Sequence, residues 1–240
     1  MNKILVDNNI NLDSKYIFDK DYLNVLEIDN ITKKIDINVL ENINVKLTII
    51  GKNNNLNLNI RMNKNSNLTL SLFTIDGTIN IDTNLYEASS FKLNNSILSS
   101  IDSNNTITVN HLEDRSISDI KNHGYSVNSS KLVFNVEGKI IASANKCECH
   151  QDNQIIENEN SLSTILPKLY IDNYDVEASH SAYVGEFKEN DLFYLMSRGI
   201  SLEDSKFLLL NAFLIGIFDF NDDYKSKLKD IILNYFNKEV

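Results

Sequence analysis

The chain has 240 residues, enough to bury a substantial core in one elongated domain or in one domain with a terminal appendage. Its net charge of -10, without a cluster of basic side chains, argues against nucleic acid as a partner. Residues 1–7 hold no apolar run long enough for a signal peptide, and the most apolar segment, 207–218, is far shorter than a membrane-spanning helix. With two cysteines only, we expect a cytoplasmic protein in a reducing compartment, with no membrane contact.

Apolar and polar residues alternate between Val45 and about Ser143, which predicts half-buried β-strands separated by polar breakers. One inward residue per strand recurs every 11 or 12 positions, namely Leu47, Leu58, Leu70, Ile81 and Leu93. A fixed spacing with a corner after every strand favours a parallel β-helix. An antiparallel β-sandwich shows a similar spacing, and Asp76-Gly77 would then be a hairpin turn. The alternation alone leaves both folds open.

The period changes from 2 to 3.6 after Gly185, which predicts helices. The first carries Leu192, Phe193, Leu195 and Met196 on one face and ends at Gly199, the second begins at Ser201, and the third begins near Asp222. The apolar face of the second is predicted as Leu202, Leu208, Leu209, Ala212, Phe213 and Gly216, and that of the third as Tyr224, Leu228, Ile231, Ile232, Tyr235 and Phe236. We expect these helices to cap the end of the β stack or to await a partner.

Two domains are therefore expected. Residues 1–186 would form a β core with a short irregular N-terminal segment, and residues 187–240 a helical segment.

The segment 167–213 carries a dense set of motifs: a proline-led strand, a Ser-His element, Ala-x-x-Gly, a Leu-Phe-Tyr-Leu helix and Ser-Arg-Gly-Ile. The residues concerned are Pro167, Leu169, Ile171, Asp175, Val176, Ser179, His180, Ala182, Gly185, Leu192, Phe193, Tyr194, Leu195, Ser197, Arg198, Gly199, Ile200 and Phe213. This pattern resembles the C-terminal signature of the SufB and SufD family of iron-sulfur cluster assembly proteins. The resemblance implies a mainly β fold, a right-handed parallel β-helix with a C-terminal α-helical segment.

Two details make the chain more similar to SufD than to SufB. The family register places Asp152 where SufB has a cysteine, and Ser179 and Ser181 flank His180 where SufB has glutamates. The resemblance is strong over the last third, loose through the β region, and absent at the N-terminus, where family members have a helical domain.

The resemblance implies that His180 faces a partner across a subunit interface and takes part in forming a transient iron-sulfur cluster, with no cofactor bound permanently. A lone histidine at a strand end is more often structural. Cys147, Cys149 and His150 are soft metal ligands close in sequence, but on a strand His150 points away from the two sulfurs. Two buried, small apolar cysteines are the favoured interpretation, and the family register gives the pair no support.

The resulting hypothesis is a scaffold that is not an enzyme. It would pair with a SufB-like subunit and hold the SufC-like ABC ATPase through Phe193, Tyr194, Met196 and Arg198, unless these side chains pack only within the chain. One alternative is a stand-alone homodimer in which Cys147 or Cys149 supplies the thiolate. Another is a carbohydrate-active or adhesive β-helix, although no paired-carboxylate motif is visible.

Overall fold

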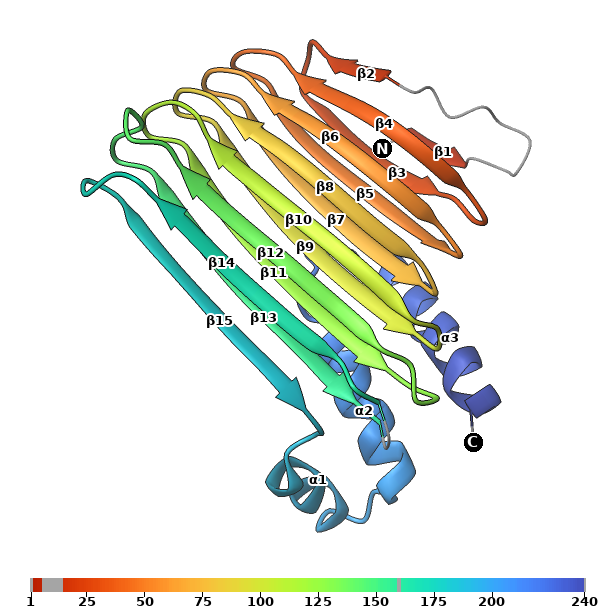
Figure 1. Cartoon of the computed structure of the whole chain (residues 1–240). Coiled ribbons are helices and arrows are strands. Elements are labelled where there is room, and N and C mark those ends of the chain that lie inside the picture. Colours follow the sequence, from red (N-terminus) through yellow and green to blue (C-terminus); the bar gives the residue numbers. More distant parts are fainter. Residues whose placement is uncertain (1, 6–14, 159–160, 240) are drawn as a thin grey trace.

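The computed structural model describes residues 2–5, 15–158 and 161–239, so residues 1, 6 and 7 of the N-terminal stretch in which no signal peptide is expected lie outside the described residues. Two sheets lie one above the other as layers (Figure 1). The odd sheet contains β1 (Asn2–Leu5), β3 (Tyr22–Glu27), β5 (Asn44–Lys52), β7 (Asn67–Ile75), β9 (Ser90–Ser99), β11 (Ile117–Ser126), β13 (Glu148–Glu157) and β15 (Glu177–Gly185). The even sheet contains β2 (Lys15–Phe18), β4 (Thr32–Val39), β6 (Asn55–Met62), β8 (Thr78–Leu85), β10 (Ser103–His111), β12 (Leu132–Ile140) and β14 (Thr164–Ile171).

Successive strands alternate between the sheets, and each strand pairs in parallel with the strand two places further along the chain. This is the topology of a β-solenoid, so the parallel β-helix is confirmed and the antiparallel sandwich is wrong. Asp76-Gly77 forms no hairpin; it lies at the corner where β7 of the odd sheet leads to β8 of the even sheet, and Asp76 has a φ of 48°. Its left-handed backbone turns the chain from one layer to the other.

The interior of the coil contains the predicted apolar column. Leu47, Leu70 and Leu93 are stacked in register in the odd sheet, and Leu58 and Ile81 in the even sheet, all of them buried. Each large side chain removed from water in this way stabilises the fold by about 1.5 to 3 kcal/mol. The inward spacing read from the sequence therefore marks the core correctly.

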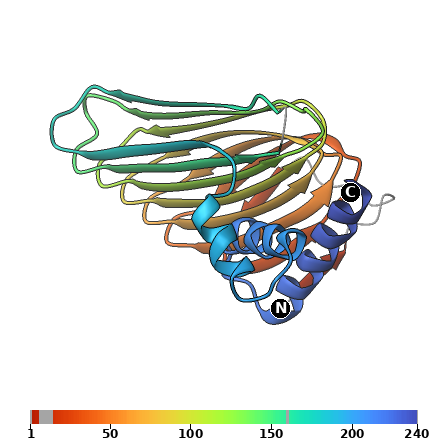
Figure 2. The same cartoon turned by 90° about the horizontal axis from the view of Figure 1, so that it is seen from below.

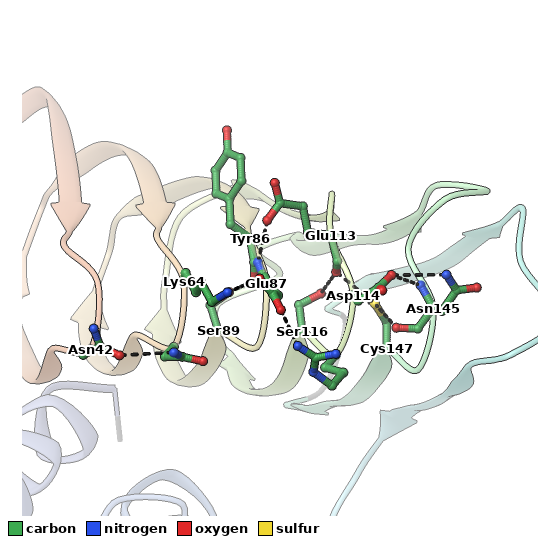
Figure 3. Close-up of polar contacts among 12 residues, drawn as sticks. Asn42, Lys64, Tyr86, Glu87, Ser89, Glu113, Asp114, Ser116, Asn145 and Cys147 are labelled. Atoms are coloured by element: carbon green, nitrogen blue, oxygen red, sulfur yellow. Dashed lines mark hydrogen bonds and ion pairs between the residues drawn. The ribbon is translucent and has the colours of Figure 1, made fainter.

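Asparagines hold many of the corners (Figure 3). Asn42 and Asn65 both adopt the left-handed conformation, which asparagine tolerates better than most residues. The Asn65 side chain donates to Asn42 Oδ1 at 3.1 Å, across 23 positions of sequence and one turn of the coil. Farther along the same edge, Arg115 forms an ion pair with Glu87 of the preceding turn. The high asparagine content thus has a structural role at the corners.

Three helices follow the last strand: α1 (Glu189–Met196), α2 (Leu202–Ile215) and α3 (Asp222–Glu239). Gly199 has a φ of 85°, as expected for a residue that ends a helix in the left-handed conformation. Ser201 is the N-cap of α2, and its hydroxyl accepts a hydrogen bond from the Asp204 N–H at 3.0 Å. The predicted helix starts and the stop are confirmed.

Helices α2 and α3 pack against the outer face of the odd sheet (Figure 2). They do not cap the end of the stack, so that expectation is wrong. The reason lies in the strands, because outward-facing Ile50, Phe73 and Leu98 give this sheet a second apolar face that water would otherwise contact. The alternation of apolar and polar residues in the sequence predicts only one apolar face for each strand.

The buried face of α2 differs from the predicted one. Leu202 and Leu208 are 46% and 47% exposed, whereas Leu210 and Leu214 are buried. Because α2 has apolar residues around most of its circumference, periodicity alone selects no face, and contact with the sheet decides. The stripe of α3 is confirmed for the side chains that the structure describes: Leu228 and Ile232 are buried, while Phe236 lies outside the described side chains.

Among the described residues, no helix is long and apolar enough to span a membrane.

Candidate functional site

The last two strands of the chain, β14 and β15, form one end of the coil, and the helices follow them in the sequence. β15 pairs with β13 on one side only, so its other edge has unpaired backbone donors and acceptors. His180 lies on this strand, in register with Gln151 of β13. The inward-facing column that ends at His180 contains one buried residue from each of the three preceding strands of the sheet: Leu93, Ile120 and Gln151. His180 is exposed because no strand stacks above it. The fold thus presents an imidazole at an open end of its interior.

The interior becomes polar towards this end. Asn95, Asn122 and Asn153 are fully buried and stacked in register on β9, β11 and β13. Their side chains form a ladder with bonds of 3.0 Å from Asn95 Nδ2 to Asn122 Oδ1 and 2.7 Å from Asn122 Nδ2 to Asn153 Oδ1. Asn153 Nδ2 then donates to the Ser181 carbonyl at 3.2 Å. The ladder therefore fixes the backbone of β15 at the residue after His180.

His111 forms a second buried polar group in the interior. Its Nδ1 lies 2.8 Å from Ser116 Oγ and its Nε2 lies 2.9 Å from Ser118 Oγ. Burial lowers the pKa of His111 to about 4, so the ring is neutral at physiological pH. His111 is therefore a buried core residue whose two ring nitrogens both have hydrogen-bond partners.

Cys147 and Cys149 are both buried free thiols. Cys147 sits in the corner before β13, with its Sγ 3.3 Å from the Glu113 carbonyl and from Ser116 Oγ (Figure 3). Burial raises the pKa of the Cys149 thiol, which disfavours the thiolate needed for metal binding or attack. His150 points outward, and its Nδ1 lies 2.9 Å from Ser179 Oγ.

These residues do not converge on one centre. Cys149 of β13 is in register with Ala178 of β15, which lies two positions before His180. Cys149 and His180 face the interior, whereas His150 faces outward. Among the residues that the structure describes, no group of three His, Cys, Asp or Glu side chains could hold a metal ion.

A polar network that sequence reasoning did not identify lies on the outer face of the same strands. The Ser181 hydroxyl donates to Asp152 Oδ1 at 2.6 Å, and Gln154 Nε2 donates to the same oxygen at 3.1 Å. Burial raises the pKa of Asp152, but these hydrogen bonds and the nearby charges of His123 and Lys121 outweigh it and leave the pKa below its ordinary value. Asp152 is therefore an anion beside the open edge.

His123 joins this region to the helices. Its ring stacks on Phe213 of α2 with centroids 4.3 Å apart, and its Nδ1 donates to the Phe213 carbonyl at 2.6 Å. Burial lowers the pKa of His123. The contact fixes the end of α2 against β11, beside the strands that lead to His180.

The residues predicted to bind a partner lie on or next to α1, which has no buried residue. Phe193, Tyr194 and Met196 are 73%, 56% and 45% exposed. The Arg198 guanidinium lies over the Tyr194 ring, 4.9 Å from its centroid. We call these four residues the α1 face; it lies apart from the odd sheet, against which α2 and α3 pack.

Comparison with known proteins identifies the family to which this architecture belongs. Residues 35–213 match the family described as "SUF system FeS cluster assembly, SufBD core domain". The iron-sulfur cluster assembly protein SufD of Bacillus subtilis is 35% identical over 115 residues, which cover 48% of this chain and 26% of that protein.

Two further relatives extend the comparison. A SufBD family protein of Pyrococcus horikoshii is 35% identical over 98 residues, which cover 38% of this chain and 22% of that protein. A SufBD family protein of Staphylococcus haemolyticus is 31% identical over 108 residues, which cover 43% of this chain and 23% of that protein. The aligned part spans about a quarter of the length of each curated relative. Since the family match covers most of the chain, from the first long strands through α2, the chain belongs to the SufBD family of the SUF iron-sulfur cluster assembly system.

Proposed function

We propose that this chain is a SufD-like subunit of a cytoplasmic iron-sulfur assembly scaffold and is not itself an enzyme. It pairs with a SufB-like subunit at the open end of the coil and binds a SufC-like ABC ATPase through the α1 face. The iron-sulfur cluster is cargo that forms at the seam between the two scaffold subunits. Family membership supports this class of function over a carbohydrate-active or adhesive β-helix.

The observation that carries the proposal is the position of His180. An exposed imidazole stands at the free edge of β15, where a second chain could extend the odd sheet by strand pairing. Neutral imidazole is a suitable iron ligand, and histidine ligation is found in iron-sulfur centres. Since the described residues offer no complete ligand set near His180, a partner must contribute the others.

The α1 face supports the proposed contact with the ATPase. Two exposed aromatic side chains and an arginine stacked on one of them are the residue types that most often anchor protein interfaces. The helix on which they lie is short and buries none of its own residues, so packing within the chain does not account for them. A partner that covers this face would remove a large apolar surface from water.

The cysteines give less support to the alternative of a stand-alone homodimer with its own thiolate chemistry. Both thiols are buried, and burial raises the pKa of Cys149. Neither sulfur reaches the surface at the open edge. In this proposal the partner supplies the reactive sulfur ligands.

Co-purification tests the proposed partners. The chain is co-expressed with SufB-like and SufC-like subunits, and a ternary complex is expected by size-exclusion chromatography. Phe193→Ala combined with Tyr194→Ala should release the ATPase while the SufB-like subunit stays bound, because the two surfaces lie on different elements. As a matched control, Leu233→Ala removes another exposed apolar side chain, on α3, and should leave the complex intact. No complex with either subunit, or equal loss in the control, contradicts the proposal.

A further inference from the structure

Gln151 is a buried amide in the strand next to the open edge. Its side chain is 4% exposed and faces the interior, where it occupies the position directly before His180 in the stacked column. Neighbouring parallel strands lie about 4.8 Å apart, so the amide and the imidazole are adjacent side chains. The amide is thus the interior group nearest in register to the proposed site.

One hydrogen bond fixes the orientation of this amide. Gln151 Nε2 donates to the Lys168 carbonyl on β14, across the interior, at 3.3 Å. Because a carbonyl can only accept, the NH2 end must face it and Oε1 must face elsewhere. In the part of the chain that the structure describes, this buried Oε1 has no hydrogen-bond donor. An acceptor buried without a donor is unfavourable, so its persistence needs an explanation.

The opposite sheet leaves room for the amide to cross the interior. Gly138 of β12 lies across from it, and a Cβ at this position would be 3.2 Å from Gln151 Nε2 and 2.4 Å from Cys149 Sγ. A side chain here would displace both residues. The glycine therefore leaves the space that the Gln151 amide group occupies.

We propose that Gln151 is a positioning residue for His180. Among the described residues, His180 included, no group donates to Gln151 Oε1, and a change of rotamer of the exposed His180 side chain would let an imidazole N–H donate to it. This bond fixes the tautomer and the ring orientation, and it leaves the lone pair of the other ring nitrogen at the open end. Metal-binding histidines commonly donate their second N–H to a carbonyl or carboxylate in this way. The inference rests on the proposed role of His180, and Gln151 itself contacts no cargo.

Nitrogen NMR of the imidazole rings tests the inference on the whole chain without metal. The chain has four histidines, so the His180 signals are assigned by their loss in His180→Gln. Spectra are recorded near pH 8.5, where an ordinary imidazole with a pKa of about 6.5 is neutral. We expect a single dominant His180 tautomer in the wild type. In Gln151→Met, a variant of similar length without an acceptor, the populations should move to those of a free imidazole.

Two further variants separate the lost acceptor from general disturbance. Gln151→Glu loses the bond to Lys168 but keeps an acceptor, and it should retain the wild-type tautomer. Gln154→Met removes an amide from the outer face of the same strand and should change nothing at His180. Identical tautomers in the wild type and Gln151→Met, or an equal change in Gln154→Met, overturn the inference. If Gln151→Met does not fold, the wild type decides the question by itself. A mixture of His180 tautomers like that of free imidazole in the wild type would overturn the inference.

The readout separates this inference from the proposed function. It requires no iron, sulfide or partner, so an unchanged tautomer refutes the role of Gln151 and leaves His180 as a site. Conversely, normal cluster assembly by a His180 variant would refute the site, and the His180 tautomer measured in the wild type and in Gln151→Met would still decide the role of Gln151.

Discussion

Protonation of His111 makes the stability of the chain depend on pH. The ring is fully buried between Ser116 and Ser118, and burial lowers its pKa to about 4. In the unfolded chain the pKa is about 6.5, so between these values the unfolded state binds a proton that the folded state does not. The contribution of the neutral ring is therefore complete above about pH 6.5 and declines as the pH falls towards 4. A difference of about 2.5 pKa units corresponds to roughly 3 kcal/mol of unfolding free energy.

Urea unfolding measured from about pH 7.5 to pH 4.5 tests this expectation. The wild type should lose stability steadily below about pH 6.5, and His111→Leu, whose side chain suits a column that contains Leu85 and Ile140, should lose much less. His150→Leu removes a histidine from the outer surface and should keep the wild-type slope. Equal slopes in His111→Leu and the wild type would refute the reasoning, whatever the absolute stabilities.

Two further pairs of substitutions test the packing of the interior and of α2 against the odd sheet. Gly138→Ala places a methyl group 2.4 Å from Cys149 Sγ and should reduce the free energy of unfolding by about 1 to 3 kcal/mol in urea melts. Gly199→Ala is the comparison variant, because Gly199 has open space around it but a left-handed backbone. It should lose about 1 kcal/mol through backbone strain alone. An unchanged midpoint for Gly138→Ala would show that the interior can yield there. Leu214→Ala removes a fully buried contact between α2 and the odd sheet and should cost about 2 to 5 kcal/mol, whereas Leu208→Ala on the exposed side should cost little. Limited proteolysis should cut the helical segment faster only in Leu214→Ala, and equal cleavage in both variants would contradict the docking.

The sequence predicted the coil and the helix boundaries because both depend on local rules. Inward leucines recur at the length of half a turn, and Ser201 and Gly199 satisfy capping requirements that hold in any helix. The choice between parallel and antiparallel strands required the family resemblance, since alternation is common to both.

Features that depend on contacts between distant segments were not predictable in this way. The buried face of α2 is set by Phe73 and Leu98, more than a hundred positions earlier in the sequence. Among the described residues, Gln151 Oε1 has no hydrogen-bond donor. The sequence could not predict this, because it depends on β14, whose Lys168 carbonyl fixes the orientation of the amide. His180 was identified from its motif, but its exposure at the end of a buried column is a property of the whole stack.

The most direct test of the account is cluster formation by a complex that contains His180→Ala. The variant is assembled with SufB-like and SufC-like subunits, iron and sulfide are supplied without oxygen, and the cluster is followed by its visible absorption. His150→Ala, on the outer face of β13, is the matched control. We expect normal assembly of both complexes, with cluster accumulation lost only in His180→Ala. A normal cluster yield from the His180→Ala complex would contradict the account.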